Sequence, residues 1–184
     1  LDGAPHAGGI EAGTSHLSVV DRAGNVVSMT TTVEAAFGSH LMVRGFLLNN
    51  ELTDFSFAAA VDGLPVANRV EAGKRPRSSM APVIAYSADG SPVLVAGSPG
   101  GSRIIAYTAG AVARVLGHGM DPKAAVAAGH VVDRNGAAVE LEAGTAMADH
   151  AAALEALGHK VKVGELTSGL HLILFTKTGL IAGV

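Results

Sequence analysis

The stretch EAGTSHLSVVD, residues 11–21, decides the fold and centres on the bond between Gly13 and Thr14. A threonine hydroxyl is a weak nucleophile without a base beside it, and the α-amino group of the same residue is one such base. That group is free only after the preceding peptide bond breaks. Glycine before the threonine suits such a cut, because a backbone without a Cβ can adopt a strained turn. The alternative is that Thr14 and Ser15 simply begin a strand.

The residues after Thr14 predict a β-hairpin. Residues 17–20 and 26–32 are the two strands, and the segment DRAGN at 21–25 supplies the turn. The candidate nucleophile would therefore stand at the first residue of a hairpin, where a rigid ladder holds it.

Patterns further along the chain predict sheets layered against helices, an α+β architecture. Apolar spacing and flanking Gly or Pro residues indicate helices at 102–116, 121–128 and 147–157. A second hairpin is predicted at 81–86 and 93–97, and further strands at 131–132, 139–141, 161–163, 170–175 and 180–184. Irregular segments are expected at 1–12, 37–46 and 58–74.

Composition excludes several classes of function. The chain has 184 residues, 48% of them hydrophobic, and a net charge of −3, as expected for a globular domain with a substantial core. Its 13 Lys and Arg form no basic run and it has no Trp, which disfavours nucleic-acid binding. No stretch approaches the ~18 consecutive apolar residues of a membrane span. With no Cys and eight scattered His, the sequence predicts no metal site and no cofactor.

The motif GTSH at 13–16 running into SVVD at 18–21 resembles the start of the small subunit of the gamma-glutamyltranspeptidases, which are N-terminal nucleophile hydrolases. Further blocks match this family in the same order. They are TTT at 30–32, LLNNE at 47–51, DFS at 54–56, KRP at 74–76, SSM at 78–80 and GSPGGSR at 97–103. The ordered set, spanning 13 to about 105, is far more specific than any one block.

The resemblance implies a four-layer αββα sandwich, completed by a large subunit outside this chain. Residues 1–13 would be the tail of the large-subunit region, and residues 14–184 the catalytic small subunit. The precursor would cut itself before Thr14 and then transfer or hydrolyse γ-glutamyl groups through an ester on that threonine. While residues 1–13 remain attached, the nitrogen of Thr14 is an amide and cannot act as a base.

The resemblance also assigns the other site residues. Gly100 and Gly101, just before a predicted helix, would form the oxyanion hole, because adjacent N–H groups at a helix start point at one place. A phosphate-binding loop and a plain turn are the alternatives, and the first lacks a following Gly-Lys-Ser/Thr. His16 is expected to pack or orient rather than catalyse.

The remaining assignments concern the γ-glutamyl donor. Its ammonium would be bound by carboxylates and its α-carboxylate by a serine pair, with a threonine and a glutamate beside the nucleophile. In the order of the chain the predicted substrate-binding residues are Thr32, Glu34, Glu51, Asp54, Ser78 and Ser79. For the carboxylates the alternative is a solvated acidic surface.

Three hypotheses for function follow. The first is a γ-glutamyl hydrolase and transferase acting on glutathione-type donors, with an amine, a peptide or water as acceptor. The second is a cephalosporin or glutaryl acylase on the same scaffold, and the third is an unprocessed, non-catalytic fragment. Because related enzymes are commonly exported, the expected compartment is periplasmic or secreted, with the cytoplasm as the alternative.

Overall fold

The computed structural model describes residues 13–184, which form two compact units. The first consists of residues 13–14 and 32–78, and the second of residues 15–31 and 79–184. The strands of the predicted hairpin, β1 (Thr14–Val20) and β2 (Val26–Thr32), each have one terminal residue in the first unit. The irregular arm predicted for residues 1–12 lies outside the described residues.

A four-stranded antiparallel sheet forms the centre of the second unit. Its order is β13-β12-β8-β7, from β7 (Val83–Tyr86), β8 (Pro92–Gly97), β12 (His171–Thr176) and β13 (Gly179–Gly183). The predicted hairpin at 81–97 is therefore confirmed. Leu94, Val95 and Ala96 of β8 are fully buried, as expected for a strand covered on both faces.

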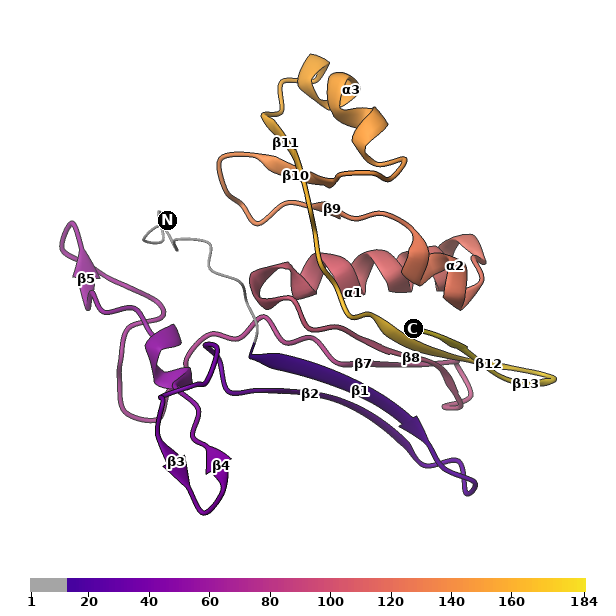
Figure 1. Cartoon of the computed structure of the whole chain (residues 1–184), viewed down its shortest axis with the longest axis horizontal. Helices are drawn as coiled ribbons and strands as arrows, with labels where there is room; N and C mark the ends of the chain where they lie inside the picture. The colour runs from indigo at the N-terminus through magenta and orange to yellow at the C-terminus, as the bar shows by residue number, and fades with distance from the viewer. Residues whose placement is uncertain (1–12) are drawn as a thin grey trace. The chain divides into compact units, whose positions relative to one another are not determined.

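Helices cover one face of this sheet, and the β1–β2 hairpin lies on the other (Figure 1). The helices are α1 (Ile104–Val112), which a π-helical turn extends to Gly117, and α2 (Pro122–Ala127). Tyr107 and Ala111 of α1 join Leu94 and Leu172 in the core cluster. On the hairpin side, the Ser28 hydroxyl donates to the carbonyl oxygen of Ala96 at 3.0 Å.

A three-stranded sheet follows α2 in the same unit. It has the order β11-β10-β9, from β9 (Val131–Val132), β10 (Val139–Glu142) and β11 (Val161–Gly164), with α3 (Ala151–Ala156) packed on β11. β10 pairs in parallel with β11 and antiparallel with β9. The class α+β is confirmed, and the second unit contains a helix layer, a sheet and a hairpin layer of the expected sandwich.

The first unit is built from short elements. β3 (Met42–Val43) pairs with β4 (Phe46–Leu47), and β5 (Ala60–Val61) pairs with β6 (Leu64–Pro65), all antiparallel. These pairs correct the prediction that 37–46 and 58–74 are wholly irregular. Asp62 and Gly63 have φ of 51° and 77° between β5 and β6, which is the positive pair that a tight hairpin turn needs.

None of the helices within residues 13–184 is long and apolar enough to cross a membrane.

Candidate active site

The hydroxyl of Thr14 belongs to a short hydrogen-bonded chain. Thr14 is the first residue of β1, and its Oγ1 lies 2.9 Å from Oγ1 of Thr32, the last residue of β2. The Thr32 hydroxyl donates to the carbonyl oxygen of Gly13 at 3.1 Å and accepts the N–H of Glu34 at 2.9 Å. Because a hydroxyl has a single proton, the Thr14 hydroxyl is then the donor to Thr32. Thr32 thus contacts both the candidate nucleophile and the carbonyl in front of it.

The carbonyl oxygen of Gly13 accepts a second hydrogen bond, and there is no space for a side chain on its Cα. The N–H of Val33 donates to its oxygen at 3.0 Å. Two donors on one carbonyl oxygen polarise the carbon and stabilise negative charge that forms on the oxygen. A Cβ added to Gly13 would overlap the carbonyl oxygen of Glu34. Glycine is therefore required here because another part of the backbone approaches closely.

Glu51 and Asp54, predicted to bind the ammonium, share one electrostatic environment with Glu34, predicted to lie beside the nucleophile. Glu51 and Asp54 are the first and last residues of a 3-10 turn, and both are half-buried. Burial is the main cause that raises the pKa of Glu51, and the charges of Asp54 and Glu34 raise it further. Glu34 adopts the left-handed region at φ 73°, two residues after Thr32. Within the first unit, the chain thus brings negative charge together, which suits a cationic group.

Asn50 is a site residue that the sequence reasoning missed. Its side-chain Oδ1 accepts a hydrogen bond from the backbone N–H of Ala35 at 3.0 Å, and its backbone N–H donates to the carbonyl oxygen of Val33 at 3.2 Å. These two bonds fix the chain just after β2, on either side of Glu34. Asn50 stands inside the matched block LLNNE, so the signal was present in the sequence.

Asn68 is a second missed residue, and it supports the turn that contains Asp54. Its Nδ2 donates to the carbonyl of Asp54 at 2.6 Å, and its Oδ1 accepts the N–H of Arg77 at 3.1 Å. Asn68 lies outside every matched motif, so no sequence signal indicated this role. The predicted serine pair follows directly: Ser78 is exposed and ends the first unit, and Ser79 is half-buried and belongs to the second.

Gly100 and Gly101 lie at the start of a helical segment, as predicted. Both have left-handed backbones, with φ of 133° and 53°, and Gly101 begins a 3-10 turn that leads into α1. A Cβ on Gly100 would lie 2.7 Å from Cε2 of Tyr107, a packing partner that the sequence did not reveal. The first N–H groups of a helical segment have no acceptor within it, so they are available to a ligand.

His16 has the packing role that the sequence predicted. Its side chain is buried, with Nδ1 2.8 Å from Oγ1 of Thr30 and Nε2 3.2 Å from Oγ of Ser18. A Cβ on Gly97 would overlap its ring, so the imidazole fills the gap between the hairpin and β8. Burial lowers the pKa of His16, and the neighbouring His171 lowers it further.

Within residues 13–184, no group of three or more His, Cys, Asp or Glu side chains is arranged to hold a metal ion.

Comparisons with known proteins identify a family for this chain. Residues 4–184 match the family described as gamma-glutamyltranspeptidase. The chain is 42% identical over 154 residues to a glutathione hydrolase proenzyme of Bacillus subtilis (strain 168), covering 82% of this chain and 25% of that protein. It is 40% identical over 124 residues to glutathione hydrolase 2 of Arabidopsis thaliana, covering 63% of this chain and 21% of that protein. The chain thus spans a quarter or less of these relatives.

Two solved structures share the fold over most of this chain. A crystal structure of Helicobacter pylori gamma-glutamyltranspeptidase superposes with a TM-score of 0.77 at 34% identity, covering 91% of this chain and 95% of that one. A cephalosporin acylase from Bacillus halodurans gives a TM-score of 0.78 at 27% identity, covering 92% of this chain and 32% of that one.

Proposed function

Because the chain belongs to the gamma-glutamyltranspeptidase family, we propose that it contributes the nucleophile of a precursor that cuts itself between Gly13 and Thr14. Residues 1–13 are then the end of the large-subunit region and residues 14–184 the small subunit, with the large subunit of the same precursor as partner. The mature enzyme transfers or hydrolyses γ-glutamyl groups. The observation that carries this proposal is the hydrogen-bonded chain from Thr14 through Thr32 to the carbonyl of Gly13.

In the proposed cut, the Thr14 hydroxyl oxygen attacks the carbonyl carbon of Gly13. The charge on the carbonyl oxygen is stabilised by the Val33 N–H and the Thr32 hydroxyl. As the C–N bond breaks, the hydroxyl proton ends on the nitrogen of Thr14. Water then hydrolyses the resulting ester, leaving a carboxylate on Gly13 and a free α-amino group on Thr14.

In the proposed turnover, that α-amino group is the general base. Its unperturbed pKa of ~7.7 to 8.0 leaves it partly neutral at physiological pH, so it can accept the Thr14 hydroxyl proton. The oxygen attacks the γ-carbonyl of the donor, and the N–H groups of Gly100 and Gly101 stabilise the oxyanion. The amine leaves with the proton, and water or a second amine releases the γ-glutamyl group from the ester.

The donor-binding groups are proposed on chemical grounds. The carboxylates of Glu51 and Asp54 bind the α-ammonium of the donor, with Glu34 beside the nucleophile and the substrate. The negative charge that Glu51 shares with Asp54 and Glu34 supports this assignment. The hydroxyls of Ser78 and Ser79 donate to its α-carboxylate. A free α-amino group on the donor is therefore the feature that this site recognises.

The test uses the full-length precursor and its Thr14→Ala variant, with Ser15→Ala as the matched control. We expect the wild type and the control to yield a subunit beginning at Thr14, seen by N-terminal sequencing, and to release p-nitroaniline from its γ-glutamyl derivative. Thr14→Ala should do neither. A variant with an alanine at position 14 that still turns over this donor would refute the proposal.

An acylase is the second candidate, and the similarity to the cephalosporin acylase is the observation that favours it. It differs in its donor, which is a glutaryl or other acyl amide without an ammonium group. Competition between γ-glutamyl and glutaryl anilides at equal concentration separates the two, because the carboxylate cluster predicts a strong preference for the first. A precursor whose intact mass is unchanged after long incubation would instead support the hypothesis of a non-catalytic fragment.

The proposed compartment is periplasmic or secreted, and the cytoplasm is the alternative. Fractionation of the source cells, with activity measured in each fraction, tests this assignment.

A further inference from the structure

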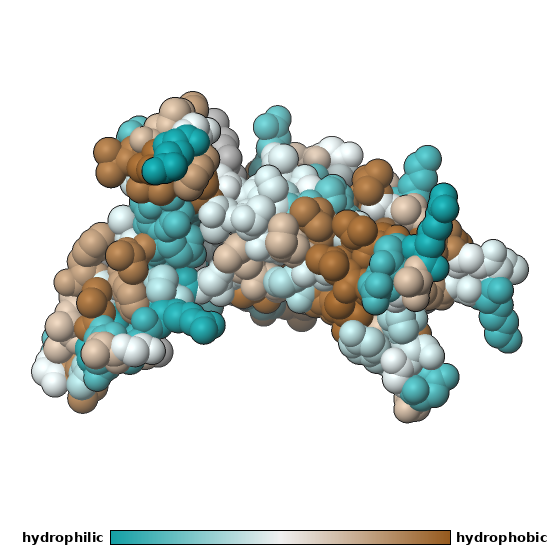
Figure 2. All heavy atoms as spheres, turned by 90° about the horizontal axis from the view of Figure 1, so that it is seen from below, coloured by the Kyte–Doolittle hydropathy of each residue, from teal (hydrophilic) through white to brown (hydrophobic). Residues whose placement is uncertain are grey.

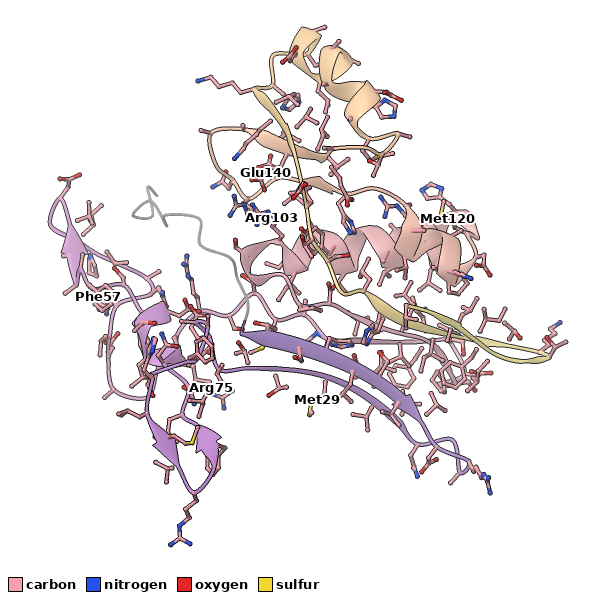
Figure 3. All side chains as sticks on the ribbon, viewed as in Figure 1. Met29, Phe57, Arg75, Arg103, Met120 and Glu140 are labelled. Carbon is pink, nitrogen blue, oxygen red and sulfur yellow. The ribbon has the colours of Figure 1, made fainter. Side chains whose placement is uncertain are left out.

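The carboxylate of Glu140, on β10, receives hydrogen bonds from two arginines. Arg103 binds it as a fork, with Nε 2.9 Å from Oε2 and Nη2 3.1 Å from Oε1. Arg134 adds a third bond, from Nη2 to Oε1 at 2.9 Å. Figure 3 shows the Arg103 and Glu140 side chains meeting between the start of α1 and β10.

The cluster of Glu140, Arg103 and Arg134 is bonded to the segment Gly100–Arg103, here called the glycine turn. Arg103 is the last residue of the 3-10 turn Gly101–Arg103, and the residue before it, Ser102, accepts a bond at its Oγ from Nη1 of Arg134 at 3.1 Å. Both side chains that follow Gly101 are therefore tied to the same carboxylate and arginine unit. The turn leads out of β8 in the four-stranded sheet, yet its far end is anchored to β10 in the other sheet.

The charges favour a rigid anchor. The Glu140 side chain is only 10% exposed, and Arg103 is 28% exposed. The Arg103 hydrogen bond is the largest cause that lowers the pKa of Glu140, and the charges of both arginines lower it further, so this carboxylate is ionised at neutral pH. A planar guanidinium fork fixes direction as well as distance. Because even a well-buried ion pair often adds little net stability, we expect the main effect of this partly buried pair to be on geometry.

The other side of the glycine turn is held by packing. The ring of Tyr107 leaves no space for a Cβ on Gly100, and the N–H of Gly169 donates to the hydroxyl of Ser98 at 3.3 Å, two residues before Gly100. The two glycines thus lie between a packed side and the ionic anchor. Breaking the anchor frees one end of the turn while the packed end stays in place.

We propose that Glu140 is a positioning residue for the oxyanion hole, acting through Arg103 and through the Arg134–Ser102 bond to hold the N–H groups of Gly100 and Gly101 in their productive direction. This inference rests on the proposed function, in which those N–H groups stabilise the oxyanion of the donor.

The two proposed reactions of the chain separate this role from a merely structural one. The cut at Gly13 uses donors from Thr32 and Val33, whereas turnover uses Gly100 and Gly101. Loss of the anchor should therefore lower kcat without slowing the cut. Because the oxyanion forms only in the transition state, kcat and kcat/KM should fall together while KM stays nearly constant. A misplacement of about 1 Å predicts a fall on the order of 10-fold to 100-fold.

The experiment compares four full-length precursors with the wild type: Glu140→Gln, Glu140→Asp, Arg134→Gln and the control Glu155→Gln, which makes the same charge change at an exposed residue of α3. We expect Glu140→Gln to mature at the wild-type rate with the reduced kcat given above. Glu140→Asp should regain part of kcat because it keeps the charge, and Glu155→Gln should match the wild type. Arg134→Gln keeps the Arg103 fork and should lose less, so it provides a milder test if Glu140→Gln folds poorly.

Three results would overturn the inference: an unchanged kcat in Glu140→Gln, a raised KM with unchanged kcat, or parallel losses of maturation and kcat in Arg134→Gln. The proposed function is judged separately, by whether the wild type turns over the γ-glutamyl donor. If it prefers the glutaryl donor instead, the same ratios of variant to wild type are measured on that donor, and the positioning role stands or falls on them.

Discussion

The hydroxyl of Thr32 forms hydrogen bonds with both the Thr14 hydroxyl and the Gly13 carbonyl. Thr32→Val keeps the shape of the side chain and removes both bonds. We expect the cut before Thr14 to slow by roughly 10²-fold to 10³-fold, the usual loss for one oxyanion donor. Time-resolved intact mass of the precursor measures it. Thr32→Ser, which retains the hydroxyl, should cut at close to the wild-type rate, and an equal loss in both variants would contradict this role.

We expect the charge of Glu51 to lower the stability of the folded protein while it favours binding of the donor. Its pKa is raised by burial first and then by Asp54 and Glu34, so its charged form is costly in the folded state. That cost is full above the raised pKa, fades as pH falls through it, and is absent below the ordinary range of a glutamate. Glu51→Gln should therefore raise Tm slightly at neutral pH and leave it unchanged in acid.

The same substitution should weaken donor binding. Losing one charged partner of the ammonium predicts a rise in KM of roughly 10-fold to 100-fold at neutral pH. In the wild type, KM should rise as pH falls through the raised pKa of Glu51, and Glu51→Gln should flatten that dependence. Steady-state kinetics over this pH range measure both effects, and a pH dependence of KM that survives the substitution would assign it to another group.

At the scale of elements, α2 depends on its N-cap. The carboxylate of Asp121 accepts the N–H groups of Lys123 at 3.0 Å and Ala124 at 3.2 Å, ahead of the proline at the first helical position. Asp121→Ala should cost about 1 kcal/mol of unfolding free energy, measured by urea denaturation. Asp121→Asn keeps an acceptor in the same place and should lose much less, so equal losses would show that the cap bonds are not the cause.

The elements also show what the sequence could predict. The sequence predicts α2 because Asp followed by Pro is a strong signal for the start of a helix. It predicts β7 and β8 because a clear turn separates two apolar runs. The β5–β6 pair was missed although Asp62-Gly63 indicates a hairpin turn, because its strands are only two residues long.

In the candidate site, the residues that the sequence could predict were those inside or beside the motifs that match the family. The matched blocks contain Thr32, which the structure joins to Thr14, and two of the three carboxylates that share one field, Glu51 and Asp54. The packing of Tyr107 against Gly100 and the hydrogen bonds between Arg103 and Glu140 could not be predicted in this way. Their partners come from distant parts of the chain, and a helical or strand period reports burial without saying what a side chain meets.

At the scale of the whole molecule, the β1–β2 hairpin has an inverted pattern of polarity. The face toward β8 has polar side chains, including His16, Ser18 and Ser28. The outer face is apolar: Leu17, Val19, Val27 and Met29 are 37% to 47% exposed. Figure 2, seen from the hairpin side, shows hydrophobic side chains exposed there. An exposed apolar patch is typical of an interaction surface, and we predict that the proposed large subunit covers this one.

Val19→Glu in the full-length precursor tests that surface, because it places a charge where the partner would exclude water. We expect at least a roughly 10-fold loss of association between the two subunits, about 1.4 kcal/mol, since an unpaired buried charge is costly. Dilution followed by size-exclusion chromatography measures the loss. Leu157→Glu is the matched control, because Leu157 is 77% exposed just after α3. If both variants dissociate alike, or neither does, the outer face of the hairpin is not where the large subunit binds.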